Sequence, residues 1–374
     1  MNLSKSKNFH TTGEGSVQVV SATCSIVFTG GGTAGHVLPT KPVIERFLDR
    51  GDRVVFIGSK SGLERQLVAD WDVEFNDITA GKLRRYLSFE NFIDAFRVPI
   101  GVLQALLLLL RIKPNAVFSK GGYVAFPVVV AAWLLRIPVV AHESDLSPGL
   151  ATRMCTRFVK TQCVSFAQTK TKAKQVVVTG TPIRAELVVG DARRAKTWLN
   201  LDSRSKVLVV VGGSLGAEAI NQVVHSSIDE LATEFVVIHV CGKGNVNESL
   251  RTLENYFQFE YINEQWGDVL ALADVVVSRS GANALFELLS LRKPNILIPL
   301  PLAQSRGDQI ENAELAEQNG WSLVLSQDQC NSESLIAEIS SLMDNLTQWQ
   351  AKLQTFDVKD STSLIVAEID QVKN

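Results

Sequence analysis

The stretch SIVFTGGGTAGH, residues 25–36, decides the fold class. It begins with a short, mostly apolar run, continues with a glycine-rich turn, and leads into a helical pattern that extends to residue 48. A strand, a glycine-rich turn and a helix in this order are typical of the first unit of an α/β sheet. Further strands are predicted at residues 53–57, 116–118 and 138–141. Their continuous apolar character, with helices between them, indicates a parallel sheet covered on both faces.

The same pattern starts again at residues 207–217, VLVVVGGSLGA, and later strands are predicted at 235–240, 275–277 and 294–298. The chain is therefore predicted to hold two doubly wound, Rossmann-like α/β domains facing a deep cleft. We expect a tail at residues 1–23, an N-terminal domain at 24–185, a C-terminal domain at 186–355, and a terminal helix within 356–374 that packs back on the N-terminal domain. Ligands of such sheets bind beyond the carboxyl ends of the strands, so the cleft is the expected site.

Composition excludes several classes of protein. The length of 374 residues fits two domains, and 37 Lys and Arg against 39 Asp and Glu give a formal net charge of -2. A nucleic-acid partner held by bulk charge is therefore not expected. The five cysteines are scattered, without zinc-site spacing, which argues against a disulfide framework or a structural metal. No apolar run approaches the ~20 residues of a membrane span, and residues 1–23 lack the apolar core of a signal peptide. We expect a cytosolic protein, with association to a membrane surface left open.

The first glycine-rich loop carries the spacing G-x-G-x-x-G at Gly30, Gly32 and Gly35. This spacing is a weak dinucleotide signal, and the second strand ends without the acidic residue that would bind a ribose. The loop still allows backbone N–H groups to approach a diphosphate or a sugar, although it equally suits a tight turn that only packs a helix on a strand. His36 closes the loop and is a candidate site residue, the alternative being an ordinary surface or core histidine.

Two further turns lead from a strand into a helix in the second domain. Ser214 lies in the turn at 212–217, where its hydroxyl suits a phosphate or simply caps the helix. Glu287 lies shortly after the turn at 279–281, where its carboxylate suits the two hydroxyls of a ribose or simply complements the helix dipole. Polar clusters also follow strands at residues 142–145, HESD, and 305–309, SRGDQ.

The segment GKLRRYLSF, residues 81–89, mixes cations with apolar side chains. From residue 82 to residue 113 there are two acidic residues, Glu90 and Asp94. The cations in the same range are Lys82, Arg84, Arg85, Arg97, Arg111 and Lys113. Such a segment suits the anionic face of a membrane, the alternative being an amphipathic helix with a solvated basic side.

Taken together, these motifs resemble the MurG family of peptidoglycan N-acetylglucosaminyltransferases, which have the two-domain GT-B architecture. The resemblance extends from about residue 25 to the end and rests on the segments 30–36, 81–86, 119–123, 142–149, 179–184, 212–217, 278–287 and 305–313. It implies inverting transfer of N-acetylglucosamine from UDP-GlcNAc to the C4 hydroxyl of the muramoyl sugar of lipid I, which gives lipid II. It also implies a peripheral location on the cytoplasmic face of the plasma membrane, with cell-wall and division proteins as further partners.

The resemblance assigns roles to individual residues. It implies that Arg184 contacts the diphosphate, that Ser214 belongs to a phosphate loop, that the backbone of Ile262 reads uracil, and that Glu287 and Gln309 contact ribose and sugar. The implied UDP-GlcNAc site consists of Thr33, Ala34, Gly35, Asp145, Arg184, Ser214, Ile262, Ala282, Asn283, Ala284, Leu285, Phe286, Glu287 and Gln309. The chain departs from a common family pattern at Ser144 and Asp145, and at Asp308.

Inversion needs a base that takes the proton of the acceptor hydroxyl. An unperturbed histidine titrates near ~6.5, which favours His36, and Glu143 is the rival. No cofactor and no metal are expected, because Arg184, Ser214 and helix N-termini would meet the charge of the departing diphosphate. Three alternatives stay open: a nicotinamide-dependent dehydrogenase, a nucleotide-sugar sensor without activity, and a related glycosyltransferase with another acceptor.

Overall fold

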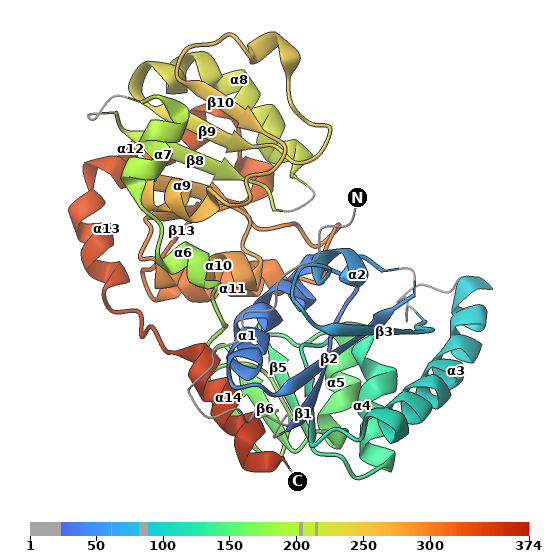
Figure 1. Ribbon diagram of the computed structural model, residues 1–374. Helices are drawn as coiled ribbons and strands as arrows, with labels where there is room; N and C mark the ends of the chain where they lie inside the picture. Colours follow the sequence, from blue (N-terminus) through green and yellow to red (C-terminus); the bar gives the residue numbers. More distant parts are fainter. Residues whose placement is uncertain (1–23, 61, 82–88, 202–204, 214–215, 374) are drawn as a thin grey trace, which may run out of the picture.

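The computed structural model describes residues 24–60, 62–81, 89–201, 205–213 and 216–373, which form two α/β units (Figure 1). The N-terminal unit contains a seven-stranded parallel sheet in the order β3-β2-β1-β4-β5-β6-β7. Its strands are β1 (Ser25–Thr29), β2 (Arg53–Ser59), β3 (Glu74–Ile78), β4 (Ala116–Ser119), β5 (Val139–Glu143), β6 (Thr161–Val164) and β7 (Val176–Val178). Its helices are η1 (Ala34–His36), η2 (Leu38–Thr40), α1 (Lys41–Asp49), α2 (Glu64–Leu67), α3 (Phe89–Ile112), α4 (Ala125–Leu134), α5 (Leu150–Cys155) and η3 (Thr156–Phe158).

The C-terminal unit contains a six-stranded parallel sheet in the order β10-β9-β8-β11-β12-β13. Its strands are β8 (Val207–Val211), β9 (Val236–Val240), β10 (Tyr256–Phe259), β11 (Val275–Ser278), β12 (Asn295–Leu297) and β13 (Leu323–Val324). Its helices, and those of the segments that join it to the N-terminal unit, are α6 (Ala185–Val188), α7 (Ala192–Leu199), α8 (Glu218–Glu234), η4 (Glu248–Leu250), α9 (Trp266–Leu272), α10 (Ala282–Ser290), α11 (Asp308–Gln318), η5 (Gln327–Gln329), α12 (Ser332–Asp344), α13 (Leu346–Leu353) and α14 (Ser361–Val372).

Both sheets are apolar on both faces, as the sequence predicts. In β1, Phe28 packs into a cluster on one face of the sheet, and Val27 packs into a second cluster on the other. In β8, Val209 and Leu208 divide between two clusters in the same way. Alternate side chains of a strand point to opposite faces, so continuous apolar strands require helices on both sides. The predicted central strands correspond to β1, β2, β4, β5, β8, β9, β11 and β12.

The last helix, α14, leaves the C-terminal unit and packs on the N-terminal unit (Figure 1). Ile365, Ile369 and Val372 join the cluster that contains Phe28, and Arg50 makes an ion pair with Asp370, with Nη1 and Oδ2 2.8 Å apart. Helix α14 therefore covers one face of the N-terminal sheet together with α1. The domain bounds given above stay a prediction.

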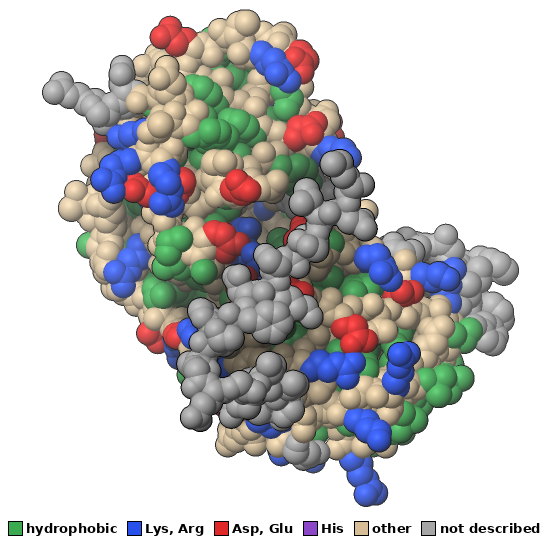
Figure 2. Space-filling model, viewed as in Figure 1, with side chains coloured by type: hydrophobic (Ala, Val, Ile, Leu, Met, Phe, Trp, Pro, Cys, Tyr) green, Lys and Arg blue, Asp and Glu red, His purple; other side chains and the backbone are tan. Residues whose placement is uncertain are grey.

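The basic and apolar segment falls partly outside the described residues, because 82–88 are not among them. From residue 89 it continues as α3, which contains Pro99. Residues Ile100, Leu103, Leu107 and Leu110 are between 50% and 62% exposed and share one side of α3. Figure 2 shows hydrophobic side chains along the outer edge of the N-terminal unit, where α3 runs. Among the described residues, no helix combines the length and the apolar character that crossing a bilayer requires.

Candidate active site

A cavity of about 1290 Å³ lies between the two units, bounded by loops that follow the strands of both sheets. The N-terminal unit contributes the glycine-rich loop with Gly32, Thr33 and Ala34, and the C-terminal unit contributes the loops after β8, β10, β11 and β12. Because parallel strands end on one side of each sheet, these loops converge on the space between the units. The structure therefore has a cavity where the sequence predicts the site, and the role of this cavity stays a prediction.

Arg184 and Glu287 face each other in this cavity. Arg184 lies at the start of α6, Glu287 lies on α10, and Nη2 of the arginine is 3.6 Å from Oε1 of the glutamate. Both side chains are about one quarter exposed, at 24% and 23%. Burial raises the pKa of Glu287, and the Arg184 guanidinium offsets part of that rise. A cation and a carboxyl group lined up in one cavity suit a ligand that carries both phosphate and hydroxyl groups.

The turn before Arg184 is fixed by a buried histidine. His142 lies at the end of β5, and its Nε2 is 2.8 Å from the carbonyl oxygen of Gly180. Burial, and next the charge of Lys120, lower the pKa of His142 to about 3, so the ring is neutral at neutral pH and donates from Nε2 to the carbonyl. Gly180 has a φ of 77°, a conformation that glycine adopts without strain. These contacts hold the backbone that presents Arg184.

Helix α10 presents only one side to the cavity. Ala284 and Glu287 line the cavity, and Ala282 is buried at the start of the helix. The side chains of Leu285 and Phe286 lie in the hydrophobic core, where Phe286 packs on Phe166 at 4.8 Å between ring centroids, and their role in the donor site stays a prediction. Residues on one side of a helix recur every three or four positions, so consecutive residues cannot all point into the cavity.

Four further predicted donor residues divide into three groups. Ile262 and Gln309 line the cavity, and Oε1 of Gln309 accepts a hydrogen bond from the backbone N–H of Leu300 at 3.1 Å. Ser214 lies outside the described residues, although its neighbours Gly213 and Gly216 line the cavity. Asp145 is absent from the cavity wall, and its partners are given below.

Arg279 is a cavity residue for which the sequence predicts no role. Its buried guanidinium donates from Nη1 to the carbonyl of Ile298 at 3.0 Å and from Nη2 to Oε1 of Gln327 at 2.6 Å. Burial lowers its pKa. Arg279 thereby joins the loops that follow β11 and β12 under the cavity. In the sequence, Arg279 stands at the start of a glycine-containing turn. The partners of its side chain are residues far along the chain, and no local sequence pattern indicates these contacts.

His36 ends η1, two residues after Ala34, and is half-buried. Its Nδ1 makes a hydrogen bond with the Thr33 hydroxyl at 3.0 Å. Burial lowers its pKa to about 3, and the charges of Lys120 and Arg306 act in the same direction. The ring is therefore neutral at neutral pH and able to accept a proton, next to a cavity that Thr33 and Ala34 line.

Glu143, the rival base, ends β5 and is buried. Its Oε1 accepts a hydrogen bond from the backbone N–H of Asp145 at 3.1 Å. Burial raises its pKa, as does the neighbouring Asp145. The carboxyl group of Glu143 thus lies behind the loop rather than on the cavity wall.

Comparison with known proteins identifies the family to which the chain belongs. The models for the glycosyltransferase family 28 N-terminal domain and C-terminal domain match residues 26–164 and 207–365. A UDP-N-acetylglucosamine--N-acetylmuramyl-(pentapeptide) pyrophosphoryl-undecaprenol N-acetylglucosamine transferase from Legionella pneumophila (strain Paris) is 46% identical over 350 residues, which cover 93% of this chain and 96% of the relative. The chain belongs to this transferase family. A relative with the same name from Clostridium perfringens (strain SM101 / Type A) is 44% identical over 343 residues, 91% of this chain and 96% of the relative.

A solved member of the family has the same fold. The crystal structure of MurG from Acinetobacter baumannii superposes with a TM-score of 0.75 at 25% identity and covers 93% of this chain and 99% of that chain. The two-domain GT-B prediction is confirmed. Membership of a glycosyltransferase family also contradicts the dehydrogenase alternative, which rested on the G-x-G-x-x-G spacing alone.

In this member of the family, Asn283 joins the two units. Its Nδ2 donates to the carbonyl oxygen of Gly35 at 3.0 Å, and its Oδ1 accepts from the Ser144 hydroxyl at 3.1 Å. The Ser144 oxygen in turn accepts from the buried Lys120 ammonium at 2.7 Å. The side chain of Asn283, a predicted donor contact, is thus directed at the N-terminal unit.

Arg306 makes a second contact between the units. Its Nη2 lies 3.0 Å from Oδ2 of Asp145 and 3.2 Å from Oδ2 of Asp308. Asn312 donates to the other oxygen of Asp145 at 3.2 Å. The carboxylates at both positions where the chain departs from the common family pattern are therefore held by protein partners. The role of Asp145 as a donor contact stays a prediction.

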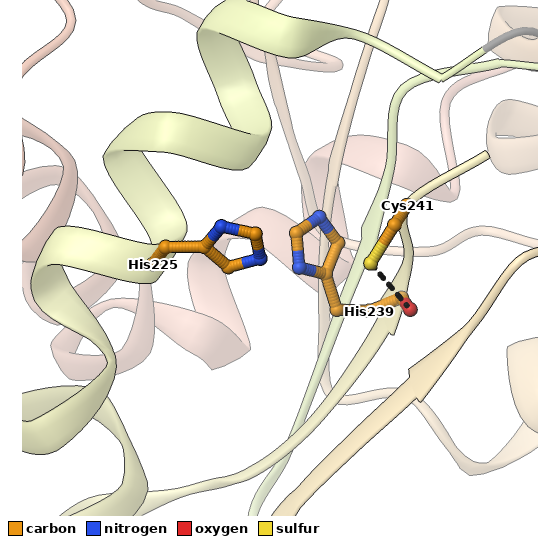
Figure 3. Close-up of side chains that lie close together, drawn as sticks. All are labelled: His225, His239 and Cys241. Atoms are coloured by element: carbon orange, nitrogen blue, oxygen red, sulfur yellow. Dashed lines mark hydrogen bonds between the residues drawn. The ribbon is translucent and has the colours of Figure 1, made fainter. Parts of the chain in front are cut away.

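A cluster of potential metal ligands lies in the C-terminal unit, where His225, His239 and Cys241 come together from α8 and from β9 with the residue that follows it (Figure 3). The sequence spacing gives no sign of this cluster. Both ring nitrogens of His239 already make hydrogen bonds, with the Tyr256 hydroxyl at 2.8 Å and with Oδ1 of Asn221 at 3.0 Å. The Cys241 thiol also donates to the carbonyl of His239 at 3.6 Å, whereas Nε2 of His225 has no hydrogen-bond partner, so the cluster is only in part a hydrogen-bond network.

Proposed function

We propose that the protein transfers N-acetylglucosamine from UDP-GlcNAc to the C4 hydroxyl of the muramoyl sugar of lipid I, forming lipid II with inversion. The observation that carries this proposal is a match over almost the whole length to transferases named for this reaction, at 44% and 46% identity. The cavity between the units is large enough for a nucleotide sugar and is open to both glycine-rich loops.

The donor site is proposed to lie on the C-terminal side of the cavity. The Arg184 guanidinium is assigned to the diphosphate, the Glu287 carboxylate to the ribose hydroxyls, and the backbone at Ile262 to uracil. The 3.6 Å separation between Arg184 and Glu287 supports this assignment, because ribose and phosphate are adjacent in a nucleoside diphosphate. As the bond to the sugar breaks, negative charge grows on the diphosphate. A guanidinium and the N–H groups of a helix N-terminus stabilise that charge as fixed donors.

His36 is proposed as the base, in preference to Glu143. Its imidazole is neutral in the free protein because burial and two nearby cations, Lys120 and Arg306, disfavour the imidazolium. An acceptor that brings negative charge offsets those cations and raises the pKa of His36, which makes the ring a better proton acceptor in the complex. The carboxyl group of Glu143 is buried, is hydrogen-bonded to the backbone of Asp145, and does not line the cavity.

The N-terminal unit is proposed to bind the cytoplasmic face of the plasma membrane, where a lipid-linked acceptor is found. The exposed apolar side of α3 supports this, together with Trp133 and Leu134 at the end of α4, which are also exposed. A second, smaller cavity beside Trp133, of about 500 Å³, is rich in cations: Arg136, Arg157, Lys160, Lys172 and Lys174. Apolar side chains next to cations suit an anionic lipid surface.

A transfer assay with radiolabelled UDP-GlcNAc tests the reaction. With lipid I as the acceptor, the expected product is labelled lipid II, and the Arg184→Ala variant is the inactive control. Label that moves only to a sterol, antibiotic or glycolipid acceptor would reassign the protein to another glycosyltransferase activity. Binding of UDP-GlcNAc with no labelled product from any acceptor would indicate a nucleotide-sugar sensor.

A further inference from the structure

A buried carboxyl group lies directly beneath the glycine-rich loop of the N-terminal unit. Glu64, the first residue of α2, is fully buried. Its Oε1 accepts a hydrogen bond from the backbone N–H of Gly32 at 2.7 Å, and its Oε2 accepts one from the Ser59 hydroxyl at 2.9 Å. Both oxygens of the carboxyl group are thus engaged, one by the loop and one by the end of β2.

Two backbone N–H groups of this loop are consequently not free to bind an anion. The N–H of Gly32 donates to Glu64, and the N–H of Gly31 donates to the carbonyl of Gly121 at 3.3 Å. A phosphate binds to a glycine-rich loop through N–H groups that have no other acceptor. A carboxyl oxygen 2.7 Å from the Gly32 nitrogen already occupies the position that a phosphate oxygen would need. Contrary to the expectation from the spacing of the glycines, these two N–H groups are directed into the protein.

The residues on either side of Gly32 hold the imidazole of His36. The Thr33 hydroxyl makes a hydrogen bond with Nδ1 at 3.0 Å, and the backbone of Gly31 makes a second hydrogen bond with the ring. Gly32 itself has a φ of 89°, so the chain turns sharply at the residue that Glu64 holds. A side chain on Gly31 would collide with Oε1 of Glu64, so the loop and the carboxyl group are closely fitted.

We propose that Glu64 is a positioning residue, which orients His36 by fixing the Gly31–Thr33 backbone, and that the N–H groups of Gly31 and Gly32 hold the loop rather than a substrate phosphate. The role in catalysis rests on the proposed function, in which His36 accepts the proton of the acceptor. The proposal has a second part that is independent of activity, because the orientation of the ring is measurable by itself.

The test compares Glu64→Gln with Glu64→Ala. Gln keeps an oxygen that accepts from Gly32 and is expected to retain kcat within about three-fold, whereas Ala is expected to lower kcat by about 10- to 100-fold, part of the 10²–10⁴ that a general base contributes. The KM for lipid I is expected to stay constant. The Kd for UDP-GlcNAc, measured by titration, is also expected to stay constant, because Arg184 and Glu287, which are assigned to UDP, lie at α6 and on α10 and not in the Gly31–Thr33 loop.

An NMR pH titration of the His36 ring, assigned with His36→Gln, is the readout that does not need activity. In Glu64→Ala the pKa of His36 is expected to move from about 3 toward its ordinary value, and in Glu64→Gln it is expected to stay. Absence of lipid I transfer by the unmodified protein would remove the proposed function and leave this measurement to decide the role of Glu64.

Three results would overturn the proposal. An unchanged kcat and an unchanged His36 pKa in Glu64→Ala would mean that Glu64 does not orient the ring. A lower KM for lipid I in Glu64→Ala would mean that the freed N–H groups bind a phosphate of the acceptor. If Glu64→Ala fails to fold, Ser59→Ala is the deciding variant, because it removes the hydrogen bond from the Ser59 hydroxyl to Oε2 of Glu64. A kcat of Ser59→Ala equal to that of the unmodified protein would then contradict the proposal.

Discussion

Asn283 donates a hydrogen bond from Nδ2 to the carbonyl oxygen of Gly35, with a separation of 3.0 Å between the two atoms. Asn283 lies at the start of α10, the helix that carries Glu287, and Gly35 directly precedes His36. The helix assigned to the donor is therefore joined, through a single amide side chain, to the residue next to the proposed base. Because Ser144 holds the other end of the same amide, its orientation is determined from both sides.

Loss of this contact is expected to slow the reaction. Asn283→Ala leaves the Gly35 carbonyl and the Ser144 hydroxyl without their partner, and we expect kcat to fall about 10-fold while the Kd for UDP-GlcNAc changes by less than about three-fold. Asn319→Ala is the matched control, because Nδ2 of Asn319 donates to the carbonyl of Leu315 in α11, the helix that Asn319 caps. In a double-mutant cycle with Ser144→Ala, a coupling free energy of about 0.5–3 kcal/mol is expected, and strict additivity would contradict the link.

Removal of the proposed base is expected to separate binding from chemistry. His36→Ala should lower kcat by about 10²–10⁴-fold, because no other group takes the acceptor proton, while UDP-GlcNAc affinity stays within a few-fold. Steady-state transfer to lipid I and donor titration are the measurements, and Glu143→Gln is the comparison, with a smaller effect on kcat. Near-normal turnover in His36→Ala would remove this histidine from the mechanism.

Neutralising Glu287 is expected to weaken recognition of the ribose. Glu287→Gln keeps the size of the side chain but loses charge-assisted hydrogen bonds of about 1.5–3 kcal/mol, so the Kd for UDP should rise about 10- to 100-fold. The variant should also lose its preference for UDP over 2′-deoxy-UDP. Glu248→Gln, a change of an exposed glutamate paired with Arg251, is the control. Equal preference for UDP in Glu287→Gln and in the unmodified protein would show that this carboxylate does not contact the ribose.

Charges placed on α3 are expected to release the protein from lipid surfaces. The double change Leu103→Glu and Leu107→Glu puts two acidic groups on the exposed apolar side, and binding to phosphatidylglycerol vesicles in a sedimentation assay should fall at least about 10-fold. Turnover of a short-chain, water-soluble lipid I analogue should stay the same. Leu364→Glu, at an exposed leucine of α14, is the matched control. Unaltered vesicle binding by the double variant would place the membrane contact elsewhere.

Acid is expected to destabilise the network around His239. Burial lowers the pKa of His239 to about 3, so between pH 6.5 and pH 3 the unfolded chain takes up a proton that the folded chain does not. The stability from this group is complete above pH 6.5 and decreases as the pH falls toward 3, with a limiting slope of about 1.4 kcal/mol per pH unit. His239→Gln lacks the titrating imidazole, so this contribution to the pH dependence of its free energy of unfolding is absent. The difference in free energy of unfolding between the two proteins, measured with urea, should therefore narrow below pH 6, and a difference independent of pH would contradict the buried neutral state.

Most central strands could be predicted from the sequence, whereas the edge strands and the central strand β6, with the sequence TQCV, could not. The strands β1, β4, β8 and β11 lie inside their sheets, where both faces are covered. Their sequences are therefore mostly apolar runs, and this pattern predicts a buried strand. In contrast, β3 reads EFNDI and is mostly half-buried, because an edge strand has solvent on one side. Its polar residues resemble those of a loop, and only pairing with β2 makes it a strand.

The sequence predicts which loops surround the cavity, but it does not predict which side chains contact one another there. Arg184 and Glu287 are 103 positions apart (287 minus 184), and their motifs place them in one cavity, where the structure finds them. Leu285 and Phe286 were included because they belong to the same motif, yet the geometry of a helix turns them into the core. The contact of Glu64 with Gly32 depends on how α2 packs against β2, and no residue type in the chain signals it.

The return of α14 to the N-terminal unit means that the polypeptide passes between the two halves twice, once after β7 and once after α13. With α14 packed on the N-terminal unit, two segments of the chain rather than one connect the halves, which restricts the ways in which the halves can separate. Proteolytic cleavage at either passage alone would leave the halves connected through the other.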